Sequence, residues 1–288
     1  MKTTGKGLVY FMGVSIIGLS LFACKKDNTT TTANETDTSI ASDHNLADAT
    51  YNDVNNIADQ ASTGTLVFYS PTYDGNGKID VASEKSSCAT ITNDTTATPH
   101  VLTIDFGTTN CTCNDGKNRR GQIIVTYTGH YRDAGSTHTI TFNNYYVNDN
   151  HVEGTKTVTN NGLNTAGNIT FSISVDGQIT KTNGDVITHV ASHTREWTEG
   201  SSTLVWNDDV YLITGSSHGT KTTSSGSTNY TAEINTALKR ALSCHWFESG
   251  VITITPAGHP ARIIDYGSGT CDDQAIVTIN GTPHTITL

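Results

Sequence analysis

The chain has 288 residues, and its 17 Lys and Arg against 27 Asp and Glu give a formal net charge of −10. Nucleic-acid binding requires a clustered basic face. The sequence has none, so we exclude nucleic acid as a partner. Hydrophobic residues make up 35% of the chain and charged residues only 15%. This content is sufficient for a globular core, and the abundance of Thr, Asn, Ser and Gly in place of charge is typical of exported β-proteins.

The N-terminus has the pattern of a signal peptide. Lys2 and Lys6 form a short positive region, and residues 8–22 form an apolar run that Gly and Ser interrupt. The run is shorter than the roughly 20 apolar residues that a membrane-spanning helix requires. It fits the hydrophobic part of a signal peptide, so we expect residues 1–23 to be removed from the mature protein.

The end of this run resembles the lipobox of bacterial lipoproteins. An aliphatic residue lies three positions before Cys24, and the small residue Ala23 lies directly before it. Phe22 is bulkier than the residue that is usual at its place. The resemblance implies that the Cys24 thiol carries diacylglycerol and that Cys24 begins the mature chain, held on a membrane by its acyl chains. The alternative is an ordinary secretory peptide with a chance cysteine.

Residues 24–43 contain few apolar side chains and predict a flexible tether. Residues 44–61 predict the one helix of the chain, with Asp43 as its N-cap. We expect this helix to pack on one face or end of a sheet; a nascent helix within a longer tether is the alternative. Its apolar residues recur at near-helical spacing: Leu46, Ala49, Val54, Ile57, Ala58 and Ala61.

The remainder, residues 62–288, predicts a single β-rich domain. Apolar and polar residues alternate along many segments, as in 169–175, where Ile, Phe, Ile and Val alternate with Thr and Ser. Asn-Gly and Asp-Gly dipeptides separate these segments and favour tight hairpins. Parallel pairing would need crossover helices, and the pattern contains none. We therefore predict an all-β fold, an antiparallel meander forming a curled sheet.

Two internal repeats refine this prediction. Residues 154–157 and 219–222 both read Gly-Thr-Lys-Thr. Residues 104–107 and 264–267 read Ile-Asp-aromatic-Gly, with Cys111 and Cys271 four residues after the glycine and Cys88 and Cys244 upstream. Exported proteins meet an oxidising compartment, so the repeat predicts disulfides Cys88–Cys111 and Cys244–Cys271. Cys113 is left over, and it could also take the place of Cys111.

No metal site or cofactor is predicted. The second ligand pair that Cys111 and Cys113 would need could be Cys244 with His245 or His189 with His193, but cysteines held in disulfides do not bind metal. His189 and His193 lie four apart on an expected strand, about 13 Å from each other, which is too far for one tetrahedral ion. Residues 72–80 resemble a calcium loop but contain too few carboxylates, and a hairpin turn explains them equally.

No catalytic residues are assigned. Glu196 and Glu199, and the pair Asp272 and Asp273, are carboxylates whose spacing does not establish a glycosidase pair. Residues 215–219 place His where a Gly-x-Ser-x-Gly nucleophile motif requires Gly. Six aromatic residues could form a carbohydrate-binding strip, although aromatic residues in strands more often pack in the core: Tyr127, Tyr131, Tyr145, Tyr146, Trp197 and Trp206.

The cysteine hairpins and the meander resemble uncharacterised Bacteroidetes-type outer-membrane lipoproteins. Residues 94–96 are similar to an O-glycosylation acceptor of that group, and the acidic residue after the lipid cysteine is matched in part by Asp27. The resemblance implies a lipid-anchored location on the outer membrane, facing the periplasm or the cell surface. We expect a non-enzymatic binding or structural envelope protein that contacts the membrane through its anchor and binds a glycan or an envelope protein. The alternatives are a lipid-handling or assembly factor with an apolar groove, and a secreted hydrolase.

Overall fold

The structure is a computed structural model that describes residues 1–2, 36–62, 72–73, 79–80, 88–113, 115–203 and 205–288. The expected signal peptide cleavage site, Cys24, most of the tether and the centre of the calcium-like loop lie outside these residues. The chain divides into two units, Met1–Ala33 and Asn34–Leu288, and the description below concerns the second. No helix among the described residues has the length and apolarity needed to cross a bilayer.

One helix and sixteen strands make up the described fold. The helix is α1 (Ser39–Ser62), and a single 3-10 turn, η1 (Trp206–Asp208), precedes β11. The strands are β1 (Thr72–Tyr73), β2 (Ile79–Asp80), β3 (Thr90–Asp94), β4 (His100–Asp105), β5 (Cys111–Thr112), β6 (Asn118–Tyr127), β7 (Thr137–Val147), β8 (Asn150–Leu163), β9 (Ile169–Thr180), β10 (Val186–Glu199), β11 (Val210–Thr223), β12 (Gly226–Ala241), β13 (Ser249–Pro256), β14 (Arg262–Ser268), β15 (Gln274–Ile279) and β16 (Thr282–Thr287).

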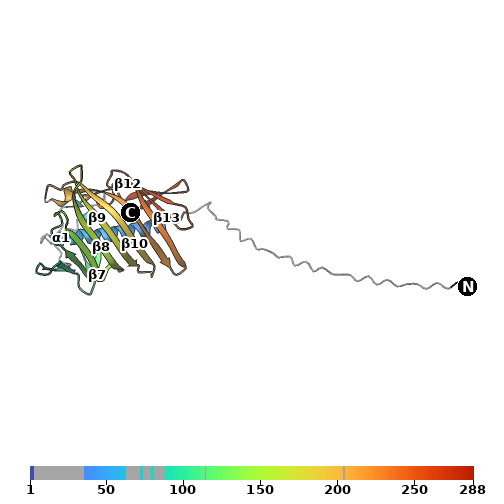
Figure 1. Cartoon of the computed structure of the whole chain (residues 1–288), viewed down its shortest axis with the longest axis horizontal. Coiled ribbons are helices and arrows are strands. Elements are labelled where there is room, and N and C mark those ends of the chain that lie inside the picture. The colour runs from blue at the N-terminus through green and yellow to red at the C-terminus, as the bar shows by residue number, and fades with distance from the viewer. Residues whose placement is uncertain (3–35, 63–71, 74–78, 81–87, 114, 204) are drawn as a thin grey trace. The chain divides into compact units, whose positions relative to one another are not determined.

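The sheet confirms the predicted antiparallel meander. Fourteen strands form one sheet in the order β16 to β6, then β4 and β3, with β5 paired to β6, while β1 and β2 form a separate hairpin. Almost every strand therefore pairs with its neighbour in the chain (Figure 1). The predicted Asn-Gly turn between β15 and β16 has φ of 50° at Asn280 and 78° at Gly281, which are the positive angles that a type I′ hairpin requires.

The sheet also curls, as expected. Tyr266 of β14 donates to Asn45 Oδ1 of α1 at 2.9 Å, and Tyr51 of α1 donates to the carbonyl oxygen of Glu153 on β8 at 2.7 Å. Asn45 and Tyr51 are about 9 Å apart along the helix axis. β14 and β8 are six positions apart in the sheet, and a flat sheet would separate them by about 29 Å. The two strands therefore approach each other around the inner face of the sheet.

Helix α1 covers the inner face of the sheet (Figure 1). Ala47, Val54 and Ala58 of the helix are buried in one apolar cluster with residues of β4 to β11, while Ile40 and Ala41 join a second cluster with residues of β11 to β16. Outward residues alternate with these buried ones along much of β6 to β15 and are largely Thr and Ser. The inner face of the sheet is therefore filled by the helix.

The helix begins five residues before the expected position. The Ser39 N–H donates to Asp37 Oδ1 at 2.8 Å, so Asp37 caps the helix and the prediction of Asp43 as N-cap was wrong. Asp43 lies inside the helix, where it is buried and contacts Lys181 Nζ at 2.7 Å and Lys221 Nζ at 2.9 Å. The first turns of α1 are polar and were therefore expected to belong to the tether. The sheet buries them and places the positive charges of Lys181 and Lys221 beside Asp43.

The two predicted cysteine pairs lie at disulfide distance. The sulfur atoms are 2.01 Å apart in Cys88–Cys111 and 2.09 Å apart in Cys244–Cys271. The first bridge ties the segment before β3 to β5, and the second ties the loop after β12 to the loop after β14. Cys113 is a free, buried thiol that lies 3.8 Å from the carbonyl oxygen of Cys111.

Candidate functional site

Two of the four carboxylates considered for catalysis, Glu196 and Asp272, have other partners in the structure. Glu196 Oε1 accepts hydrogen bonds from the side-chain amides of Asn164 and Asn168 at 2.8 and 2.7 Å. Asp272 Oδ1 accepts one from the backbone N–H of Gln274 at 3.0 Å. These contacts order the turns beside them. We therefore assign no catalytic role to them.

The aromatic residues mostly occupy the core, which was the favoured interpretation. Tyr127, Tyr131, Tyr145 and Trp197 are buried, with exposures of 8% or less. Tyr146 is the exception, because it is half-buried and carries Arg120 over its ring at 3.8 Å. The side chain of Trp206 lies outside the described set. An exposed carbohydrate strip of these residues is therefore not formed.

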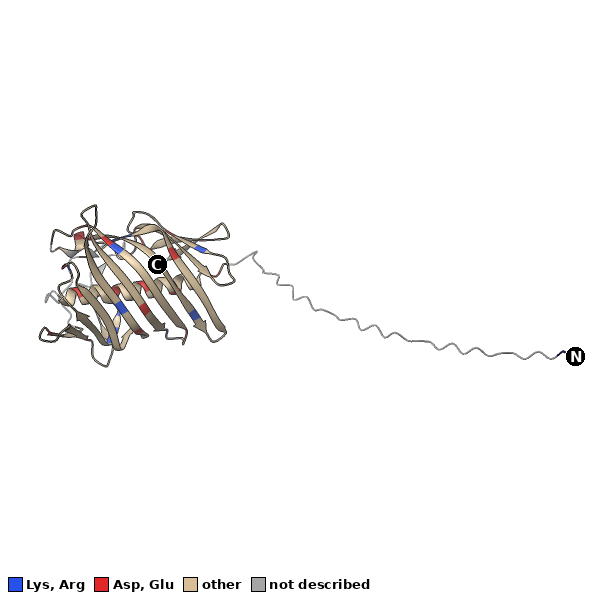
Figure 2. Ribbon diagram, in the orientation of Figure 1, with Lys and Arg blue, Asp and Glu red and all other residues tan. Residues whose placement is uncertain are grey.

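Three aspartates of α1 contact basic or imidazole groups beside them on the sheet: Asp43, Asp48 and Asp53. A fourth, Asp59, is affected by the charges of Arg195 and Arg132. Figure 2 shows acidic residues along the helix behind the strands. The negative charge of Asp59 is only partly balanced by positive charge. Burial raises its pKa to about 6, and the charges of Arg195 and Arg132 oppose this rise only in part. The two Gly-Thr-Lys-Thr repeats serve the same interface, because Lys156 Nζ donates to Tyr51 O at 2.9 Å and Lys221 contacts Asp43.

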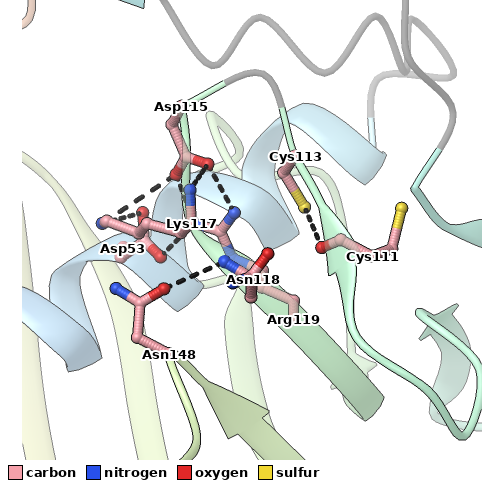
Figure 3. A network of polar contacts seen from close by, with 8 residues as sticks. All are labelled: Asp53, Cys111, Cys113, Asp115, Lys117, Asn118, Arg119 and Asn148. Carbon is pink, nitrogen blue, oxygen red and sulfur yellow. Dashed lines mark hydrogen bonds and ion pairs between the residues drawn. The ribbon is translucent and has the colours of Figure 1, made fainter.

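Arg119 forms the most buried ion-pair network of this interface (Figure 3). Its side chain is 1% exposed and lies 2.7 Å from Asp53 Oδ2 and 2.5 Å from Asp115 Oδ2. Lys117 Nζ lies 3.2 Å from Asp53 Oδ1. Although burial raises the pKa of Asp53, Lys117 and Arg119 hold it at about 2. The network therefore fixes α1 to β6 through charged groups.

A second polar cluster, the His44–Asp48–His189 cluster, is the candidate site. His44 and Asp48 lie four residues apart on one face of α1, and His189 enters from β10. Asp48 Oδ1 lies 2.9 Å from His189 Nε2, and Asp48 Oδ2 lies 3.8 Å from His44 Nδ1. The imidazole side chains are at most 1% exposed and the Asp48 side chain 12%. The three residues thus bring two imidazoles and a carboxylate together in the interior.

The electrostatics of this cluster favour a charged carboxylate beside a neutral imidazole. Burial lowers the pKa of His44 to about 4, which Asp48 only partly offsets, so His44 is neutral at pH 7. Burial raises the pKa of Asp48, but His44 and His189 outweigh that effect and hold it well below its ordinary value. Lys156 is also buried nearby, and burial lowers its pKa to about 7. A neutral imidazole and an ionised carboxylate are the protonation states in which these groups bind metal ions.

The cluster also contains the residue types of a serine hydrolase triad. His44 Nε2 lies 2.8 Å from Ser217 Oγ on β11, and Asp48 lies on the other side of the ring. However, the 3.8 Å between Asp48 and His44 Nδ1 is too long for a hydrogen bond. Ser217 is also only 5% exposed, under the helix. The arrangement therefore fits ion binding better than attack on a substrate.

Sequence reasoning did not identify this cluster. His189 was considered only together with His193 on the same strand, and not with residues of the helix. The available signal was the four-residue spacing of His44 and Asp48 at the start of the expected helix, which places both on one face. No local pattern indicated that β10 would bring His189 to this face.

The second candidate site is a depression of about 830 Å³ on the outward face of β10 to β13, named the outer groove. Cross-strand pairs set its floor: Thr231 on β12 lies opposite His218 on β11 and Thr255 on β13, and Glu233 lies opposite Ser216 and Thr253. The groove is lined by apolar surface, including that of the half-buried Val190, and by hydroxyl, amide, imidazole and carboxylate groups. It can therefore donate and accept hydrogen bonds at regular spacing.

Comparison of the chain with protein-family models, with curated proteins and with solved structures gave no significant match. The functional argument therefore rests on the residues and on the geometry.

Proposed function

We propose that this protein is a membrane-anchored extracytoplasmic lipoprotein that binds a glycan without catalysis, through the outer groove. Two separate observations support the proposal. The lipobox-like segment that ends at Cys24 supports the lipid anchor and the extracytoplasmic location. The composition of the groove supports a glycan as the ligand.

The groove carries the proposal about the ligand. Neighbouring strands are about 4.8 Å apart, and residues of the same face repeat about every 6.6 Å along a strand. The groove therefore presents a grid of polar groups, including Thr231, Glu233 and His218. Sugar hydroxyls both donate and accept hydrogen bonds, so a glycan matches such a grid better than an apolar ligand does. The lipid-handling alternative is less favoured because α1 covers the inner face of the sheet, where an acyl chain would have to lie.

The proposed lipid anchor and membrane location are tested by metabolic labelling of the acyl chains. Cells that express the full chain are labelled with an alkyne analogue of palmitate, and the protein is located by membrane fractionation. We expect label on the wild-type protein and a membrane-bound product, and neither in the Cys24→Ala variant. Equal labelling of both proteins, or an uncleaved N-terminus in the wild type, would contradict the lipoprotein proposal.

The ligand is tested with the full chain, purified in detergent, on an array of glycans. Thr231→Arg places a long charged side chain in the groove and is expected to weaken glycan binding at least tenfold, with an unchanged thermal midpoint. The matched control is Ser174→Arg, an exposed mid-strand position on β9 outside the groove, which should bind as the wild type does. Equal loss in both variants, or no binding by the wild type, would refute a glycan site in the groove.

A further inference from the structure

We propose that His44, Asp48 and His189 bind one zinc ion, which fastens α1 to β10. None of the three ligands lines the outer groove. Ser217 of β11 borders both sites, with its Oγ 2.8 Å from His44 Nε2, while its neighbours Ser216 and His218 are exposed on the groove side.

The positions of the donor atoms fit a small tetrahedral ion. One donor atom from each residue lies within 4.8 Å of the other two. A tetrahedral zinc ion with bonds of about 2.0–2.2 Å separates its ligand atoms by roughly 3.3–3.6 Å. Asp48 Oδ1 lies 2.9 Å from His189 Nε2 and Asp48 Oδ2 lies 3.8 Å from His44 Nδ1, so the two imidazoles approach different oxygens of one carboxylate. A shared ion requires the three side chains to draw together from separations of at most 4.8 Å to this range.

The buried imidazole atoms provide the second, independent observation. Among the described residues, His44 Nδ1 and His189 Nδ1 are buried without a hydrogen-bond partner. His189 Nε2 lies 2.9 Å from Asp48 Oδ1 and pairs with that carboxylate. Buried polar atoms are nearly always satisfied. Imidazole nitrogens that are buried beside a carboxylate and lack hydrogen-bond partners are the arrangement that a bound cation explains.

The second ring nitrogen of His44, Nε2, has the kind of partner that is usual for a metal-binding histidine. A metal-binding histidine usually gives its second ring N–H to a fixed acceptor, which sets the orientation of the ring. With His44 Nδ1 on the ion, the Nε2–H donates to Ser217 Oγ at 2.8 Å. Ser217 is therefore a positioning residue and not a ligand.

The donor set selects the class of ion. Two imidazole nitrogens and one carboxylate suit zinc and its first-row neighbours, whereas calcium and magnesium prefer sites made of oxygen. None of the donors is a thiol, so the oxidation that forms the two disulfides leaves the site intact. The positive charge of Lys156 nearby is compatible with the ion, because its Nζ is engaged by Tyr51 O and Asn52 Oδ1 and burial lowers its pKa.

The test uses the full chain, refolded with and without zinc because the site is buried, and dialysed before its metal content is measured. We expect one zinc per wild-type chain, and a tetrahedral absorption spectrum when cobalt replaces zinc. Asp48→Asn and His189→Gln are expected to lower zinc affinity at least 100-fold, and Ser217→Ala about 10- to 100-fold. The control is His138→Gln, a buried histidine of β7 whose Nε2 already contacts Gly129 O at 3.0 Å, which should retain wild-type affinity.

A structural readout accompanies the affinities. Removing zinc from the wild type should lower its thermal midpoint and increase amide exchange in α1, and should change neither in His189→Gln. Circular dichroism identifies any variant that fails to fold; Ser217→Ala, which keeps all three ligands, then carries the test. Absence of zinc from the refolded wild type overturns the proposal. Equal zinc affinity in Asp48→Asn and the wild type also overturns it, and shows that the zinc binds adventitiously at the surface. The zinc test and the glycan test can fail separately, because Thr231→Arg is expected to weaken glycan binding but to bind zinc as the wild type does.

Discussion

Arg119→Ala is expected to lower the free energy of unfolding by about 3–5 kcal/mol, measured by urea denaturation. The Arg119 side chain is 1% exposed and contacts both Asp53 and Asp115, whose side chains are 20% and 7% exposed. Removing the guanidinium leaves two carboxylates with insufficient positive charge in a poorly solvated place. Since Asp53 belongs to α1 and Arg119 to β6, we also expect faster amide exchange in the helix.

The neighbouring residue provides the matched control. Arg120 lies next to Arg119 on β6 and pairs with Asp149, but these side chains are 24% and 51% exposed. Exposed ion pairs contribute about 0–1 kcal/mol, so Arg120→Ala should change the stability by no more than that. A similar loss in both variants would show that the stabilisation comes from β6 packing in general and not from the buried charges.

Loss of the Cys244–Cys271 disulfide is expected to lower the free energy of unfolding by about 3 kcal/mol. The two cysteines are separated by 27 residues, and the bridge restricts the unfolded chain by closing this loop. The variant Cys244→Ser/Cys271→Ser removes it and is compared with the wild type by chemical denaturation, with and without a reductant. Reductant should destabilise the wild type by more than it destabilises the variant, in which one bridge remains.

Peptide mapping without reduction gives the connectivity. We expect peptides joined through Cys88–Cys111 and Cys244–Cys271, with Cys113 alkylated only after denaturation because it is buried. Cys113→Ala is the control, because it removes a cysteine that forms no disulfide. We expect it to lower the free energy of unfolding by about 1 kcal/mol through lost packing. A peptide that joins Cys88 to Cys113 would contradict the structure at this site.

Features that depend on neighbouring residues could be predicted from the sequence. The alternation in residues 169–175 became β9, the Asn-Gly pair at 280–281 became a tight turn, and the matching cysteine hairpins indicated the correct pairs. Each depends on side-chain alternation, on turn conformation or on a cysteine hairpin whose two cysteines are 23 or 27 residues apart. The antiparallel meander followed from these signals because most neighbouring strands are also neighbours in the chain.

Features that depend on distant segments were decided by the tertiary structure. The start of α1 and the role of Asp43 changed because the curled sheet buries the first turns of the helix and brings Lys181 and Lys221 to them. The His44–Asp48–His189 cluster unites residues more than 140 positions apart, and the outer groove needs four strands side by side. Local sequence determines which segments become strands and turns, whereas the burial and charge around a side chain depend on what the curl of the sheet places against it.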